Sequence, residues 1–120
     1  FDRYIADRQY SNRSEAVRDL IRRTLIEEEW DAGEEVVGVV TLVFDHHRPH
    51  LQDRITEIQH AFHSLVISTT HVHLDHDNCL EVIIVKGRAD RVRNMADQLT
   101  AVRGVKSGDL TAASTGVQLR

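Results

Sequence analysis

The chain has 120 residues, of which 41% are hydrophobic and 28% are charged, so its length allows one ordinary globular domain or two small ones. No apolar run approaches the roughly 20 residues that cross a bilayer, and a lone cysteine excludes an internal disulfide, so we expect a cytoplasmic protein with no membrane partner. The formal net charge is −4, but the first 26 residues hold six arginines against four acids, which favours an anionic partner at that end.

Two helices with a short break between them are predicted at the N-terminal end. The first ends near Arg8, and the second covers residues 13–30, with Ser11 or Asn12 as its cap. Together they are too short to bury a stable core, so we expect them to pair with a second copy or to dock on the rest of the chain. The residues that follow end the helix and mark a boundary, which gives a first domain over residues 1–31.

From residue 35 onward the pattern predicts strands and helices in the order βαββαβ. The expected strands cover residues 36–44, 66–74, 80–86 and 105–113, and the expected helices cover residues 50–65 and 89–102. This order is the ferredoxin-like plan, an α+β fold in which both helices cover one face of a four-stranded sheet. The strands also carry apolar residues for the other face, so we expect an oligomer that covers it. The second domain therefore spans residues 35–113, and residues 114–120 form a loose tail.

The histidines are concentrated in one part of the chain, where all eight lie within 31 consecutive residues and the only cysteine follows them. On the second strand His71 and His73 point to one face, and we expect Val72 and Leu74 to point to the other face, toward the helices. The hairpin then returns Cys79 opposite the two histidines. Two imidazoles and a thiolate that converge in this way predict a binding site for a borderline metal ion.

A fourth ligand is expected from the helix over residues 50–65. His60 lies about 200° around this helix from Ile58, the centre of its apolar stripe, and therefore points away from its own sheet. It can reach a neighbouring subunit that covers the open face. The helical phase therefore favours a metal site shared between two subunits, provided that the oligomer forms.

The remaining candidates surround this set. Glu81 shares the face of the cysteine and can hold an imidazole N–H, while His63 and His76 are candidates for weaker metal contacts. We interpret the other three as parts of a solvated turn: His46, His47 and His50. Three imidazoles and one thiolate suit Ni(II), Cu(II) or Zn(II), and the spacing does not fix the geometry that would separate a planar site from a tetrahedral one.

These residues also resemble a known family. The motifs that match the NikR family of nickel-responsive transcriptional regulators are Gln59-His60, His71-Val72-His73, Cys79-Leu80-Glu81-Val82, Val85-Lys86-Gly87 and Arg103-Gly104-Val105-Lys106. Upstream, residues 10–19 resemble the turn and second helix of the ribbon-helix-helix domain of that family.

The resemblance implies a ribbon-helix-helix domain joined to a ferredoxin-like, ACT-like domain that assembles a homotetramer, a dimer of dimers. It implies one square-planar Ni(II) per subunit, held by His71, His73 and Cys79 of one subunit and His60 of another. It further implies a repressor that binds operator DNA of nickel-uptake genes when nickel is plentiful. The family reads DNA bases with a strand before the first helix, and the printed chain lacks that strand.

Two further sites follow from the same resemblance. A monovalent cation between the domains would be held by the carboxylates of Glu15 and Asp19 and by the backbone carbonyls of three residues, Thr100, Val102 and Val105. From the residues alone, the two acids are an ordinary pair on a helix surface. The start of the second helix, at Asn12, Arg13 and Ser14, offers contacts to DNA phosphates.

The same residues also allow other classes of function. An ACT-like domain that senses amino acids or other small molecules would make the histidines incidental. A copper- or zinc-binding homologue would use the same ligands, and a metal-storage protein would bind several ions per chain without DNA. An enzyme is not expected, because four protein ligands close the metal site and no nucleophile lies beside a base.

Overall fold

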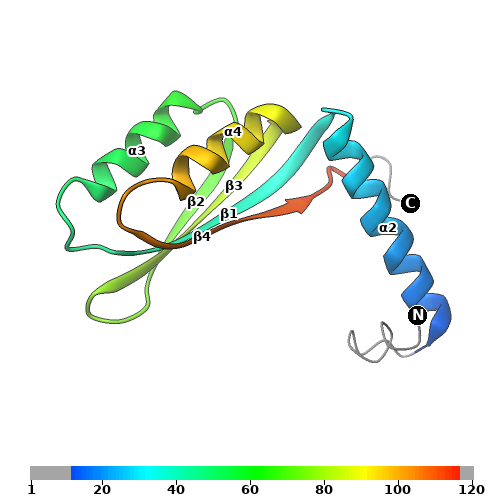
Figure 1. Cartoon of the computed structure of the whole chain (residues 1–120), viewed down its shortest axis with the longest axis horizontal. Coiled ribbons are helices and arrows are strands. Elements are labelled where there is room, and N and C mark those ends of the chain that lie inside the picture. Colours follow the sequence, from blue (N-terminus) through cyan, green and yellow to red (C-terminus); the bar gives the residue numbers. More distant parts are fainter. Residues whose placement is uncertain (1–11, 117–120) are drawn as a thin grey trace.

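The computed structural model describes residues 12–116 (Figure 1). The predicted helix that ends near Arg8 and the last four residues of the expected tail lie outside this range. The elements in chain order are α2 (Arg13–Asp31), β1 (Glu35–Asp45), α3 (Leu51–Ala61), β2 (Val66–His73), β3 (Asn78–Arg88), α4 (Ala89–Thr100) and β4 (Val105–Ala113). The predicted α+β class and the order βαββαβ from residue 35 onward are confirmed.

The sheet is antiparallel with the strand order β2-β3-β1-β4, and α3 and α4 cover one of its faces (Figure 1). The core lies between this face and the helices. Along the central strands every second residue is buried, because successive side chains point to opposite faces. The helices contribute the apolar stripes predicted from their spacing, among them Ile55 and Ile58 of α3 and Val92, Met95 and Leu99 of α4.

Helix α2 extends away from the sheet, and only its C-terminal end packs on it (Figure 1). Trp30 is buried there, and its indole N–H donates a hydrogen bond of 2.9 Å to the carbonyl of Ala113. The hydroxyl of Ser114 lies 2.9 Å from a carboxylate oxygen of Glu29. The prediction of a loose tail is therefore wrong for Ser114, because the pairing of β4 with β1 carries this residue to the end of α2.

Two predicted boundaries also differ from the structure. Helix α3 ends at Ala61, and Phe62 and Leu65 reach the core from a turn. The third strand was predicted to end at residue 86, but Gly87 lies inside β3, where a Cβ atom would collide with the side chain of Leu65. The glycine therefore serves a close approach between β3 and the segment that leads into β2.

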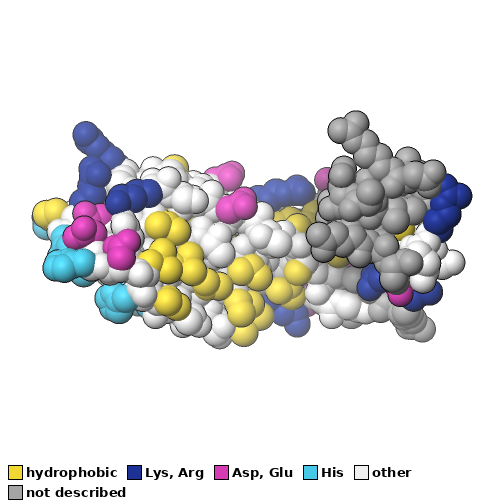
Figure 2. All heavy atoms as spheres, turned by 90° about the horizontal axis from the view of Figure 1, so that it is seen from below, with side chains coloured by type: hydrophobic (Ala, Val, Ile, Leu, Met, Phe, Trp, Pro, Cys, Tyr) yellow, Lys and Arg dark blue, Asp and Glu magenta, His cyan; other side chains and the backbone are white. Residues whose placement is uncertain are grey.

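The face of the sheet opposite the helices is apolar, as expected. Figure 2 shows hydrophobic side chains gathered over the sheet on this side. The alternation along β1 and β3 places these residues there: Val37, Val39, Val43, Leu80, Val82 and Ile84. None of the described helices has the length and apolar character needed to cross a membrane.

Candidate metal centre

The pairing of β2 with β3 sets the position of the predicted ligands. His71 pairs with Glu81 and His73 pairs with Cys79, and residues paired across two strands project from the same face. Cys79 and Glu81 are buried on the face that the helices cover. The two imidazoles therefore lie on the helix side of the sheet.

This corrects the predicted orientation of β2. Val72 pairs with Leu80 on the open face, where its side chain is 41% exposed, and Leu74 is 52% exposed beyond the end of the strand. Neither points toward the helices. The reason is that Ile83 and Val85 anchor β3 in the core and fix which of its residues face the helices, and β2 follows through its register.

The thiol of Cys79 is fully buried, with its sulfur 3.7 Å from the carbonyl oxygen of Phe44. Burial raises the pKa of the Cys79 thiol, and the nearby carboxylates of Glu81 and Asp45 raise it further. The thiol is therefore protonated at neutral pH, and a metal ion that takes it as a ligand must displace its proton.

The imidazoles of His71 and His73 are exposed, because β2 is the edge strand of the sheet. Their ring centroids are 5.4 Å apart. The ring of His71 also meets Phe44 edge-to-face at 6.0 Å, which holds one flank of the imidazole against the core. Phe44 carries no ligand atom in its side chain, so a search of the sequence for metal ligands does not connect it with this site.

Glu81 is the buried charged group beside these ligands, with an exposed fraction of 4%. Its Oε1 accepts a hydrogen bond of 3.4 Å from the amide of Gln59, whose own oxygen accepts one of 2.9 Å from the hydroxyl of Thr69. Its Oε2 is buried and has no hydrogen-bond partner among the described residues. Burial raises the pKa of Glu81. The hydrogen bond from Gln59, the charge of His71 and a weaker interaction with the nearby amide of Gln52 act in the opposite direction.

A buried carboxylate oxygen with no partner requires a reason, because such an atom costs free energy. Here it lies opposite His71 across the strand pair, where a carboxylate can hold the N–H of a ligating imidazole. Two imidazoles, a thiol and this carboxylate are a donor set that suits a borderline divalent ion such as nickel. The residues present therefore fit a nickel site.

His60 is exposed on α3, which agrees with the helical phase read from the sequence. Its carbonyl oxygen accepts hydrogen bonds from the backbone N–H of His63, at 3.2 Å, and lies 3.1 Å from Nδ1 of the same residue. Within the described chain, no three of the four predicted ligands His60, His71, His73 and Cys79 bring their ligand atoms within 4.8 Å of one another.

A different group of side chains does have its ligand atoms within that distance. His47, His76 and Asp77 are the one set of three in residues 12–116 whose ligand atoms all lie within 4.8 Å of one another. His76 was predicted as a weaker candidate, whereas His47 was assigned to a solvated turn. The register of β1 with β3 brings them together, because it pairs Asp45 with Asn78 at the ends of the two strands. The predicted ferredoxin-like order of the strands would have allowed this proximity to be predicted, but the spacing of the residues along the chain does not indicate it.

The other predicted sites lie at the two ends of the molecule. At the start of α2, Oδ1 of Asn12 accepts the backbone N–H of Glu15 at 2.9 Å, and Arg13 and Ser14 are exposed in the first turn. Asp19 pairs with Arg23 at 2.8 Å.

The backbone groups predicted for the cation site lie around the C-terminal end of α4, where the N–H of Val105 donates to the carbonyl of Val102 at 3.1 Å, just after Thr100. Figure 1 shows that this end lies far from the start of α2. The structure therefore does not bring Glu15 and Asp19 together with these three residues within one chain.

A family profile and several known proteins match most of this chain. The sequence profile described as "NikR C terminal nickel binding domain" matches residues 37–113. Proteins named "Putative nickel-responsive regulator" are similar over nearly the whole chain. The one from Desulfotalea psychrophila is 54% identical over 99% of this chain and 88% of its own, and the one from Geobacter sulfurreducens is 55% identical over 99% and 86%.

Solved structures with low sequence identity share the fold. An uncharacterized protein from Thermotoga maritima has a TM-score of 0.59 at 15% identity and covers 66% of this chain and 98% of its own. The ACT domain from GTP pyrophosphokinase of Chlorobium tepidum has a TM-score of 0.53 at 16% identity, with 64% and 99% covered. These likenesses identify the fold as ACT-like and carry nothing about function.

Proposed function

The chain belongs to the family of nickel-responsive regulators with a NikR C terminal nickel binding domain, and we propose that it represses nickel-uptake genes by binding operator DNA in response to Ni(II). The observation that carries the proposal is the pairing of His71 with Glu81 and of His73 with Cys79. It gathers two imidazoles, a thiol and a buried carboxylate at one edge of the sheet.

The proposed site binds one Ni(II) per subunit. His71, His73 and Cys79 provide three ligands, and His60 of another subunit provides the fourth. The outward position of His60 supports this division, because an exposed residue on the outer side of α3 is available to a second copy. Bound nickel would supply coordinate bonds that join the two subunits.

Each side chain then has a defined task. Cys79 gives up its proton and becomes a thiolate ligand. Glu81 accepts the N–H of the imidazole of His71 through its unpartnered oxygen and so orients that ring. Gln59 keeps Glu81 in place and links α3 to β2 through Thr69, which connects the helix that carries His60 to the strand that carries the other ligands.

The arrangement of subunits is part of the proposal. The open apolar face of the sheet, together with Val72, is suited to contact a second copy, and we propose a homotetramer built as a dimer of dimers. Because the start of α2 and the end of α4 lie far apart in one chain, the monovalent cation site would take Glu15 and Asp19 from one copy. Its carbonyl ligands, at Thr100, Val102 and Val105, would then come from another.

DNA binding is assigned to residues 1–31 as a ribbon-helix-helix domain. On α2, Val17, Leu20 and Ile21 are 43%, 44% and 55% exposed, so this apolar stripe needs a partner such as the same helix of a second subunit. The N-terminal turn of α2, at residues 12–14, would contact phosphates through its backbone N–H groups and through Arg13. We place the regulator in the cytoplasm, where operator DNA is found.

The test is a nickel titration of the whole chain followed by absorption spectroscopy. We expect a thiolate-to-nickel charge-transfer band with the d–d features of a planar site, and we expect both to be lost in Cys79→Ser. Glu57→Gln, an exposed change on α3, is the matched control and should leave the spectrum unchanged. A spectrum without a thiolate band in the unaltered protein would contradict the proposal.

A second candidate is a regulator that responds to a small anionic molecule. The observation in its favour is a pocket of about 570 Å³ between α3 and the end of α4, lined in part by Arg48, His50, Arg54 and Arg103. Calorimetric titration with amino acids and other small carboxylates separates the two candidates, because only the second predicts saturable binding that Arg54→Ala weakens.

A further inference from the structure

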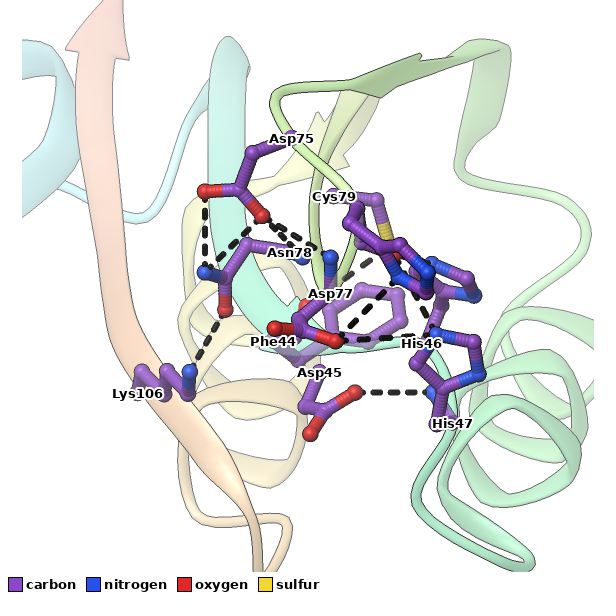
Figure 3. Close-up of polar contacts among 10 residues, drawn as sticks. Phe44, Asp45, His46, His47, Asp75, Asp77, Asn78, Cys79 and Lys106 are labelled. Atoms are coloured by element: carbon purple, nitrogen blue, oxygen red, sulfur yellow. Dashed lines mark hydrogen bonds and ion pairs between the residues drawn. The ribbon is translucent and has the colours of Figure 1, made fainter.

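Lys106 reaches from β4 across the end of β1 to the turn that precedes Cys79. Its Nζ donates a hydrogen bond to Oδ1 of Asn78, the first residue of β3. In the sheet order β2-β3-β1-β4, strand β1 lies between these two residues, so the contact skips a strand. Figure 3 shows the side chains of Lys106 and Asn78 meeting end to end, with Asp75 on the other side of the amide.

An irregularity in β4 gives Lys106 this direction. Val43 and Phe44 are adjacent on β1, but their partners on β4, Ser107 and Val105, are two residues apart. Lys106 is the extra residue between these two pairs. An extra residue of this kind makes a β-bulge, which bends the strand and can turn a side chain toward a new neighbour. The bulge therefore directs Lys106 at the turn beyond β1.

Asn78 belongs to a turn that hydrogen bonds hold together. Oδ1 of Asp75 accepts the backbone N–H groups of Asp77 at 2.9 Å and Asn78 at 2.8 Å, and the carbonyl of Asn78 accepts the N–H of Leu74 at 2.9 Å. The amide nitrogen of Asn78 also lies 3.3 and 3.2 Å from the two carboxylate oxygens of Asp75. These bonds leave Oδ1 of Asn78 free to accept from Lys106. The turn is therefore one hydrogen-bonded unit, and a contact with Asn78 acts on all of it.

The position of this turn affects two proposed nickel ligands, because His73 ends the strand before it and Cys79 directly follows Asn78. Metal ligands must be held within about 0.5 Å of the geometry that binds the ion. Bonds within the turn set its shape but not its place beside β1. Contacts from other elements set that place, among them the N–H of His46, which donates to the turn at 3.0 Å, and the Nζ of Lys106.

We propose that Lys106 is a positioning residue for the nickel site and acts on Cys79 through Asn78. The inference rests on the proposed function, because it takes Cys79 as a nickel ligand. Without the contact from Lys106, the turn keeps its own hydrogen bonds but separates from β1 more often, as a local opening of the structure. Cys79 then leaves its buried place with the turn, so the metal-free thiol reacts faster and bound nickel is released faster.

The test compares Lys106→Met, which keeps the length of the side chain and removes its charge and donors, with Lys86→Met. Lys86 is the other lysine of the chain and pairs with Glu35 at 3.5 Å at the far end of β3, so it is the matched control. Because Cys79 is the only cysteine, the reaction of the metal-free protein with a chromogenic aromatic disulfide measures the opening at this residue. We expect Lys106→Met to accelerate this reaction about two- to fivefold, the scale of one exposed charged contact.

The second measurement is the loss of the thiolate band when nickel-loaded protein meets an excess of chelator, and we expect a similar acceleration in Lys106→Met. Lys106→Arg keeps the charge and the donors and should restore both rates. If Lys106 acts through Asn78, adding Lys106→Met to Asn78→Ala should accelerate neither rate further, because the two changes remove the same contact.

Unchanged rates in Lys106→Met, or an equal acceleration in Lys86→Met, would overturn this inference. A full further acceleration when Lys106→Met is added to Asn78→Ala would do the same, because Lys106 would then act without Asn78. All of these results leave the thiolate band of the unaltered protein in place, which separates them from a failure of the proposed function. An unaltered protein that lacked the band would contradict the proposed function and this inference with it.

Discussion

The unpartnered oxygen of Glu81 makes Glu81→Gln an informative change, because the substitution keeps the size of the side chain and removes its charge. Oε1 of a glutamine at this position can still accept the hydrogen bond from Gln59. The metal-free protein should lose no stability at neutral pH, because the substitution removes a buried charge and leaves a neutral polar group of the same size in its place. Nickel affinity should fall.

The expected loss of affinity is about 10- to 100-fold, which corresponds to about 1.4–2.8 kcal/mol, because the amide replaces the carboxylate that orients His71. Chemical denaturation of the metal-free protein and competition titration with a nickel chelator measure the two effects. Glu57→Gln makes the same chemical change on the exposed side of α3 and should alter neither. If Glu81→Gln destabilised the metal-free protein and left nickel affinity unchanged, Glu81 would be a structural residue and the reasoning would be refuted.

Because the pKa of Cys79 is raised, nickel binding at neutral pH releases the proton of this thiol. The affinity for nickel, measured by competition with a chelator, should therefore rise about tenfold or more for each pH unit. An affinity that does not depend on pH would contradict this. Because the pKa of Glu81 is raised, the folded metal-free protein binds more protons than the unfolded chain, so its stability should fall as the pH rises from 4.5 in denaturant titrations, and Glu81→Gln should remove this slope. Gly87→Ala should cost about 1–3 kcal/mol in thermal unfolding through its collision with Leu65, and combining it with Leu65→Ala should give less than the sum of the two single effects.

Much of the fold follows from the sequence because each element carries its own period. The alternating β-branched residues of β1 and the stripe that centres on Ile58 predict the strand and α3, and the same stripe places His60 on the outer side of the helix. These are local properties of a segment, so neighbouring residues determine them. The order of the elements then limits the sheet to a small number of arrangements.

The predicted orientation of β2 was wrong, because the orientation of this strand depends on its pairing with β3 and not on its own sequence. In His71-Val72-His73-Leu74 polar and apolar residues alternate, which suggests that the apolar residues face the core. This inference assumes that only one face of the sheet is apolar. Here both faces are apolar, and β2 lies at the edge, so its register with β3 decides which side faces the helices. The pairing of His71 with Glu81 and of His73 with Cys79 shows that the histidines lie on the helix side.

The group at His47, His76 and Asp77 was missed for a related reason. Its members lie in two segments separated by nearly thirty residues, as the contact between His47 and the carbonyl of His76 shows. They meet because β1 and β3 pair through to their ends. A search for metal ligands that uses spacing alone detects pairs within one strand or hairpin, and it does not detect ligands that the sheet brings together.

The claim that nickel joins two subunits is tested most directly by mixing two defective variants. His60→Ala lacks the ligand from α3, and Cys79→Ser lacks the thiolate, so neither protein alone can form the complete site. If the site is shared between subunits, a mixed oligomer contains sites in which Cys79 of one subunit meets His60 of the other. We therefore expect the thiolate band and the planar d–d features to return when the two variants are unfolded together, refolded and loaded with Ni(II). A mixture with no more of this absorption than the two separate proteins would contradict a shared site.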